Sequence, residues 1–352
     1  MKKIAILLLV ALCIGIFAGC SGDVVIINNC TCPADGHNTP TNPQPSQPAV
    51  EGALKTGLAI VCSTNDSENG VKAAYDVTLV AVLVDDEGII RDCIIDSIGT
   101  EITFDATGTI TSDITAAIKT KNELGDSYGM VAWGGAVAEW YQQADALAQY
   151  AIGKTVSELK NGAIDATGKA PAGSELASSA TIYLGGYVSA IEAAVNGAQH
   201  LGAQGGDELR LAVIPSAKSS VSATAEKAGT AQLDCDVTAL TVKEGKITSC
   251  YIDSLQAKVT FGTDGVITGG VSDAVATKNQ LGEKYGMVAW GGAIAEWNAQ
   301  AASFANYITG KTAAEVAGIV VDAGTKPTGA DLSSSVTIAI GGFQALIAKA
   351  MG

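Results

Sequence analysis

The chain repeats itself, and this duplication constrains the fold more than any other feature of the sequence. Residues 121–140 return as residues 278–297, with 16 of 20 positions identical. The correspondence extends from about residue 58 with residue 211 to about residue 193 with residue 349. A repeat of this length exceeds the ~20–50 residues of a solenoid unit, and each copy is long enough to close its own core. The sequence therefore predicts two tandem copies of one domain, at 53–204 and 205–352.

Each copy reads as a small antiparallel sheet followed by helices. In the first copy, two β-branched runs flank an Asp-Asp-Glu-Gly turn, which predicts a hairpin, and apolar residues at helical spacing follow. The expected strands are 75–84, 89–98 and 102–104, with 236–242, 246–255 and 259–261 in the second copy. The expected helix passes through 131–151 and stops at Gly153, and a short Ala-rich helix ends each copy. The predicted fold class is α+β.

The Gly-Lys-Thr sequence at 153–155 is similar to the end of a phosphate loop, but Ala148 stands where that loop needs a glycine. Thr155 with Glu158, and Thr312 with Glu315, have instead the spacing of capping boxes. We expect a helix start at each of these places rather than a nucleotide site.

The N-terminus predicts where the protein is located. Lys2 and Lys3 precede an apolar stretch at 4–17, and small residues lead directly to Cys20. The stretch is too short to span a bilayer comfortably, which favours a cleaved lipoprotein signal at 1–19 and a lipidated Cys20. Multiple acyl chains would anchor the protein stably to the cell membrane, on its extracytoplasmic side.

Residues 20–52 follow as a tether that is rich in proline and polar residues. Cys30 and Cys32 lie in it, and with His37 they provide too few ligands for a tetrahedral metal site. We predict no metal centre.

Charge and histidine content exclude several classes of function. The formal net charge is −15, and no cluster of Lys or Arg offsets it, so nucleic-acid binding is not expected. The only histidines are His37 in the tether and His200, which has no counterpart in the second copy. A function shared by both copies therefore uses no histidine relay and no usual zinc site. We expect a carrier or binding protein rather than a hydrolase or transferase.

Four cysteines lie within the repeats, and two arrangements are open for them. Outside the cell they can pair, and Cys62–Cys93 and Cys235–Cys250 are the pairings least demanding on the chain. Cys62 aligns with Pro215, however, so the copies do not share one disulfide framework. Free buried thiols are the alternative.

A Ser-Ser-x-Thr segment lies near the end of each copy, after an acidic residue and before a Gly-Gly pair. It reads Glu-Leu-Ala-Ser-Ser-Ala-Thr at 175–181 and Asp-Leu-Ser-Ser-Ser-Val-Thr at 331–337. Here the chain resembles the bacterial FMN-binding domain family, whose attachment motif is Asp-x-x-Ser/Thr-Gly/Ser-Ala-Thr. The opening hairpin is similar too. The departures are Glu175, Val336 and the absence of the common glycine.

The resemblance implies FMN esterified to Thr181, Thr337 or both, in an electron carrier with a redox partner in the cell envelope. A Ser-Ser-x-Thr stretch that opens a helix would supply amide donors for the phosphate, and aromatic residues could line a slot for the ring. The implied cofactor-binding residues are Thr181, Thr337, Ser178, Ser179, Ser334, Ser335, Trp133, Trp290, Tyr128 and Tyr285.

The residues also allow a simpler interpretation. The segments 180–184 and 336–340 can be plain strands, and the tryptophans can be core anchors between helix and sheet. The protein is then a non-enzymatic lipoprotein that binds a small ligand or a partner surface through its repeated Tyr-Gly-Met-Val-Ala-Trp-Gly-Gly segments.

Overall fold

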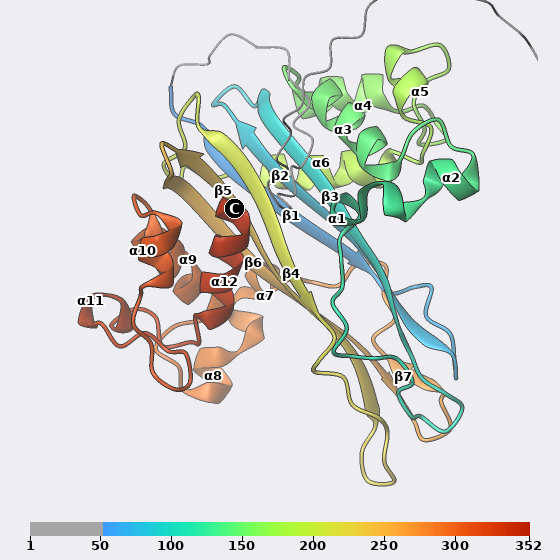
Figure 1. Cartoon of the computed structure of the whole chain (residues 1–352), viewed down its shortest axis with the longest axis vertical. Coiled ribbons are helices and arrows are strands. Elements are labelled where there is room, and N and C mark those ends of the chain that lie inside the picture. The colour runs from blue at the N-terminus through green and yellow to red at the C-terminus, as the bar shows by residue number, and fades with distance from the viewer. Residues whose placement is uncertain (1–51) are drawn as a thin grey trace, which may run out of the picture. The chain divides into compact units, whose positions relative to one another are not determined.

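The computed structural model describes residues 52–352, which contain two antiparallel sheets and the helices that cover them (Figure 1). The α+β class is therefore confirmed. The first sheet has the order β1-β2-β3 and the second has the order β4-β5-β6-β7. The strands are β1 (Lys55–Ser63), β2 (Lys72–Val84), β3 (Ile90–Thr103), β4 (Glu208–Ser216), β5 (Gly229–Lys243), β6 (Lys246–Phe261) and β7 (Ile267–Gly269).

The same order of helices follows each sheet. In the first repeat they are α1 (Lys121–Leu124), the 3-10 helix η1 (Gly125–Tyr128), α2 (Met130–Gly134), α3 (Trp140–Ala151), α4 (Val156–Ala163), α5 (Glu175–Ser179) and α6 (Gly185–Asn196). In the second they are α7 (Lys278–Leu281), η2 (Gly282–Tyr285), α8 (Met287–Gly291), α9 (Trp297–Ile308), α10 (Ala313–Ala317), α11 (Ala330–Ser333) and α12 (Gly341–Met351).

The two sheets face each other, and each carries its helices on the other side. The second half of β2 is almost continuously apolar, and all six of its residues from Leu79 to Val84 are buried. Leu79, Ala81 and Leu83 point into a core shared with β4, β5 and β6. Val80, Val82 and Val84 point into a separate core beneath α3 and α6. A strand covered on both faces has no polar face to present to water.

Each predicted hairpin is present. β2 pairs with β3, and β5 pairs with β6, both antiparallel. The expected third strand at 102–104 is wrong as a separate element, because β3 runs through to Thr103 without a break. The same holds for 259–261, which is the end of β6. The first sheet has one further strand, β1, before its hairpin, and the second has two, β4 before its hairpin and β7 after it.

The helix predicted over 131–151 is interrupted. α2 ends at Gly134, because Gly135 adopts the left-handed conformation with φ of 62°. α3 begins six residues later, at Trp140. The capping boxes at Thr155 and Thr312 are confirmed, since each hydroxyl accepts from a backbone amide while the glutamate reaches back.

All four core cysteines are free and buried, so of the two arrangements that the sequence left open, free buried thiols are the one present. Strand geometry gives the reason. Cys62 and Cys235 face the core between the sheets, whereas Cys93 and Cys250 face the helices on the outer sides. The members of each candidate pair therefore lie on opposite faces of their sheet.

Among residues 52–352, no helix has the length and apolar character needed to cross a membrane. The predicted signal at 1–19, lipidated Cys20 and the Cys30–Cys32 pair lie outside the described residues.

Candidate functional site

One buried glutamine in each repeat joins the two segments that the sequence singled out. The side chain of Gln143, on α3, is fully buried. Its Oε1 accepts from the backbone amides of Thr181 and Ile182, at 2.8 and 3.1 Å. Its Nε2 donates to the carbonyl of Ala138, just beyond the Trp-Gly-Gly loop, at 2.8 Å. The carboxamide thus uses its acceptor and its donor at once.

The second repeat has the same arrangement around Gln300. Its Oε1 accepts from the amides of Thr337 and Ile338, at 2.8 and 3.2 Å. Its Nε2 donates to the carbonyl of Ala295 at 2.8 Å. Two copies with diverged sequences have therefore kept one geometry, which attaches the threonine segment to the Trp-Gly-Gly loop.

The threonine hydroxyls lie at the surface next to this glutamine. Thr181 is exposed and Thr337 is partly buried. Thr181 Oγ1 donates to Gln143 Oε1 over 3.3 Å, and Thr337 Oγ1 donates to Gln300 Oε1 over 3.2 Å. Both contacts are long for an O–H donor, so each hydroxyl is weakly held.

The serines end a helix rather than begin one. Ser178 and Ser179 are exposed and form the last turn of α5. Ser334 is exposed and Ser335 partly buried, directly after α11. The expected phosphate-binding helix start is wrong, because the Thr181 and Ile182 amides are bonded to Gln143 and α6 begins only at Gly185. The alternative of a plain strand is also wrong, since residues 180–184 have no regular structure.

The Trp-Gly-Gly loops project two tryptophans into solvent. Trp133 is 83% exposed and Trp290 is 90% exposed, so neither is a core anchor. A buried glutamate fixes the loop in the first repeat, because Glu139 accepts from the amides of Met130 and Val131 at 2.8 and 2.9 Å. Such a carboxylate satisfies the free amides of a helix start. Glu296 accepts from the equivalent amides in the second repeat.

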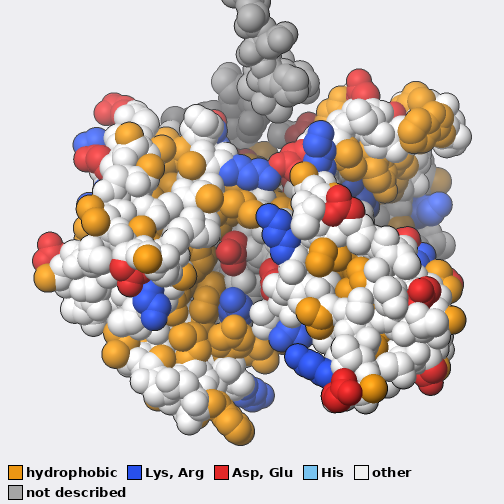
Figure 2. Space-filling view, turned by 60° about the horizontal axis from the view of Figure 1, so that its bottom comes forward, with side chains coloured by type: hydrophobic (Ala, Val, Ile, Leu, Met, Phe, Trp, Pro, Cys, Tyr) orange, Lys and Arg blue, Asp and Glu red, His pale blue; other side chains and the backbone are white. Residues whose placement is uncertain are grey.

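The indole of Trp133 lies against the backbone of Gly129. A Cβ at Gly129 would lie 2.6 Å from the ring, and this residue also has φ of 80°, so two constraints require glycine. The other hydrophobic residues exposed on these loops are Val131, Val137, Val288 and Ile294. Figure 2 shows hydrophobic side chains in several patches between the charged groups on one face of the molecule.

Tyr128 and Tyr285 are partly buried and each lies beside a lysine. Lys121 Nζ lies 5.3 Å from the centroid of the Tyr128 ring and 5.2 Å from that of Trp140. Lys278 has the same position between Tyr285 and Trp297, at 5.3 and 4.8 Å. These distances fit cation–π contacts. Trp140 and Trp297, unlike the loop tryptophans, are core residues.

A partly buried carboxylate, Asp96 on β3, contacts the start of α1, which carries Lys121. Asp96 Oδ1 accepts from the amides of Ser97 and Asn122, at 2.7 and 3.1 Å. Burial raises the pKa of Asp96 to about 6, against the lowering effect of these hydrogen bonds. Asp253 has the equivalent place in the second repeat, and burial raises its pKa as well.

Sequence reasoning missed Gln143, Gln300, Lys121 and Lys278 as parts of the site. The signal for the glutamines was present, since each is a polar residue on an otherwise apolar helical stripe and is identical in both copies. Within residues 52–352, no group of three or more His, Cys, Asp or Glu side chains is arranged to hold a metal ion.

Comparisons of the chain with protein-family models, with curated proteins and with solved structures give no match.

Proposed function

We propose that the protein is an extracytoplasmic electron carrier whose FMN is esterified to Thr181 and, in the second repeat, to Thr337. The observation that supports this proposal is the glutamine clamp, by which we mean the contacts of Gln143 with Thr181, Ile182 and Ala138 and the equivalent contacts of Gln300. An acceptor threonine must be reachable by a transferase and yet be fixed in place. Thr181 meets both requirements, because its hydroxyl is exposed and its amide is bonded to a fully buried side chain.

The surroundings of Thr181 favour the first repeat over the second as the site of flavin attachment. Tyr183 is 59% exposed, and one part of its ring lies so close to Gly168 and Gly185 that a Cβ at either would collide with it. An aromatic ring with an open side next to the acceptor is a suitable neighbour for a flat isoalloxazine. The second repeat has Ala339 at this position, and its Thr337 is partly buried. We therefore assign the main attachment to Thr181.

When bound, FMN supplies the electron-transfer chemistry that the side chains lack. The contribution of this chain is to hold the attachment point through Gln143 and to keep the folded part outside the membrane, through the lipid on Cys20. The redox partner is a protein of the cell envelope, and neither nucleic acid nor metal takes part.

The test is made with protein purified from its native host. The wild-type chain should show flavin absorbance and the mass of an FMN phosphodiester on the peptide that contains Thr181. Thr181→Ala should remove most of the flavin, whereas Ser189→Ala, which removes an exposed hydroxyl on α6, should retain it. A colourless wild-type protein would refute the proposal, as would undiminished flavin in Thr181→Ala.

A second candidate function is binding through the Trp-Gly-Gly loops. The observation that favours it is the exposure of Trp133 and Trp290, because large hydrophobic side chains presented in this way mark interaction surfaces. Trp133→Ala with Trp290→Ala should abolish cosedimentation of the protein with isolated cell walls or with lipid vesicles. Val320→Ala, at another exposed hydrophobic residue, is the control. Equal cosedimentation of the three proteins, or none at all, would refute this function.

A further inference from the structure

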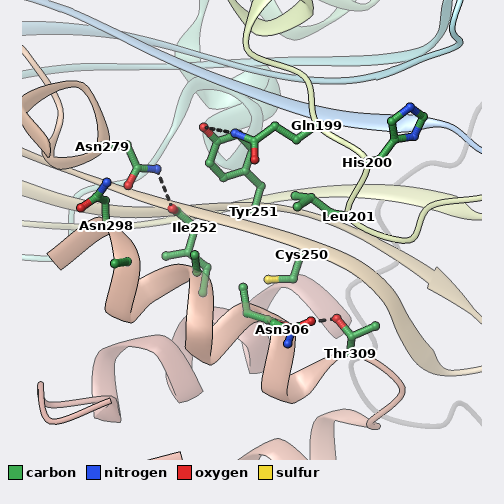
Figure 3. A pocket seen from close by; sticks show the side chains of 13 residues that line it. Gln199, His200, Leu201, Cys250, Tyr251, Ile252, Asn279, Asn298, Asn306 and Thr309 are labelled. Carbon is green, nitrogen blue, oxygen red and sulfur yellow. Dashed lines mark hydrogen bonds between the residues drawn. The ribbon is translucent and has the colours of Figure 1, made fainter. Parts of the chain in front are cut away.

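A pocket that the proposed flavin site does not use lies between the second repeat and the segment that connects α6 to β4. It has a volume of about 480 Å³ and is bounded by β6, by one face of α9 and by residues 199–201 of this connecting segment (Figure 3). This volume is within the ~300–1,000 Å³ range of small-molecule sites. The pocket lies on a different face of α9 from Gln300, which points into the core.

The pocket exists because α9 has smaller side chains than its counterpart α3. Alanines at 299, 302 and 305 line it. The first repeat has Gln142 and Asp145 at the positions of Ala299 and Ala302, and Tyr141 at the position of Asn298. At the C-terminal end of α9, Thr309 is likewise smaller than Ile152, its counterpart in the first repeat. On the face of α9 that lines the pocket, these differences leave space that larger side chains occupy in α3, while Ala305 is matched by Ala148.

The lining is about half polar and half apolar, and it contains no Lys, Arg, Asp or Glu; besides the alanines of α9, its apolar part is formed by Leu201, Cys250 and Ile252. Carboxamides come from Gln199, Asn279, Asn298 and Asn306, and hydroxyls come from Tyr251 and Thr309. Figure 3 shows Asn298 and Asn279 near one end, Asn306 and Thr309 near the other, and Tyr251 with Gln199 between them. One histidine lines the pocket, His200, and its Nε2 lies 3.0 Å from Asp86 Oδ1.

Two of these carboxamides have unused hydrogen-bonding capacity. The side chains of Asn298 and Asn306 form no hydrogen bond with any other residue of 52–352, in contrast to Asn279, which donates to the carbonyl of Ile252 at 2.9 Å. A carboxamide both donates and accepts, and this matches a ligand hydroxyl, which also does both.

Tyr251 contributes a ring and a hydroxyl. Its hydroxyl lies 3.5 Å from Gln199 Nε2, which joins the linker to the wall of the pocket. A tyrosine hydroxyl is protonated at neutral pH and able to donate, and burial raises the pKa of Tyr251 further. Its ring offers an apolar surface for the C–H face of a cyclic ligand.

We propose that this pocket binds a neutral polyhydroxylated ligand, a mono- or disaccharide. A phosphorylated or carboxylated ligand would require a cationic partner, and no Lys or Arg lines the pocket. An ammonium group would require a carboxylate, and no Asp or Glu lines it. A purely apolar ligand would leave the carboxamides unpaired. Ligand hydroxyl groups can form hydrogen bonds with the carboxamides of the lining and leave no charge without a partner.

The test is saturation-transfer NMR on the full chain, with glucose, N-acetylglucosamine, maltose and diacetylchitobiose as neutral probes and glucose 6-phosphate and glutamate as charged ones. At least one neutral sugar should bind, and more tightly than either charged probe. Ala299→Gln with Ala302→Asp, which installs the residues of the first repeat, should weaken that binding at least about tenfold. Asn298→Ala with Asn306→Ala, which leaves the cavity open, should weaken it as well.

The matched control is Asp145→Ala, the reverse change at the same position of the first repeat, and it should leave sugar binding unchanged. Thermal unfolding checks that each variant is folded. The proposal is overturned if no neutral sugar binds, if a charged probe binds more tightly, or if the filled pocket binds the sugar as well as the open one. Flavin content is independent of all these outcomes, so the two proposals fail separately.

Discussion

At the scale of single residues, the Gln143 side chain is important because it bonds three backbone groups from two separate segments of the first repeat. We predict that Gln143→Leu lowers the free energy of unfolding by about 2–3 kcal/mol, because it leaves the Thr181 and Ile182 amides and the Ala138 carbonyl without their partner. Chemical denaturation measures the change. Gln149→Leu, the same substitution at an exposed position of α3, should have little effect. Equal effects of the two substitutions would mean that the clamp contributes no stability.

The pH dependence of stability should reveal Asp96. Its pKa is about 6 in the folded chain, above the ordinary value of about 3.9 expected in the unfolded chain. The folded state therefore binds more protons between these values, so the stabilising contribution is complete below pH 4 and is lost as the pH rises through 6. We predict that Asp96→Asn is more stable than wild type at pH 7, by on the order of 2 kcal/mol, and not at pH 4.

Asp105 provides the control of opposite sign. The Thr107 hydroxyl and nearby amides hold the pKa of Asp105 below its usual value. The contribution of ionised Asp105 to the stability of the fold is present above the pKa that this group has in the unfolded chain, and it is lost as the pH falls. Asp105→Asn should therefore be less stable than wild type at pH 7, opposite in sign to Asp96→Asn. Denaturation curves at both pH values decide the matter, and a wild-type-like profile for Asp96→Asn would count against a partly buried, perturbed carboxyl.

Among helices and strands, the sequence predicted those elements whose signals are local. The hairpins, the capping boxes at Thr155 and Thr312 and the C-terminal helices of both repeats follow from turn chemistry and periodicity. The break at Gly135 was missed, because the apolar spacing of α2 continues across it. The contacts of Gln143 with the threonine segment were missed for a different reason: the Thr181 and Ile182 amides lie 38 and 39 positions away, and only the tertiary structure brings them to Gln143.

The ends of β3 and β6 are joined by an aromatic contact between the repeats. Phe104 and Phe261 stack with their centroids 4.0 Å apart and their planes within 2° of parallel. We predict that Phe261→Ala costs about 3–5 kcal/mol, and that a double-mutant cycle with Phe104→Ala gives a coupling of about 0.5–1.5 kcal/mol. Val266→Ala, at an exposed residue before β7, should cost little. A coupling energy of zero would mean that the contact between Phe104 and Phe261 does not stabilise the association of the two repeats.

For the chain as a whole, the repeats are arranged like the two subunits of a symmetric dimer. Phe104 stacks on Phe261, which is its own counterpart 157 positions later. Strand β1 contacts β6 while the equivalent β4 contacts β3, so the contacts are reciprocal. Contacts of this kind define a two-fold, isologous interface. The sequence predicted that each copy can close a core, and each does so beneath its helices, but the third core between the sheets belongs to both.

This shared core predicts how an isolated repeat behaves. In a fragment of residues 53–204, the inner face of β1–β3 would expose side chains such as Leu79, Leu83 and Phe104, which are buried in the whole chain. Exposed apolar surface of this extent drives association. Because the interface is isologous, a second copy of the fragment offers a nearly complementary face, and we expect a homodimer. The full chain should unfold in one cooperative transition. Light scattering and calorimetry test both statements, and a stable monomer of 53–204 would show that the two repeats are independent domains.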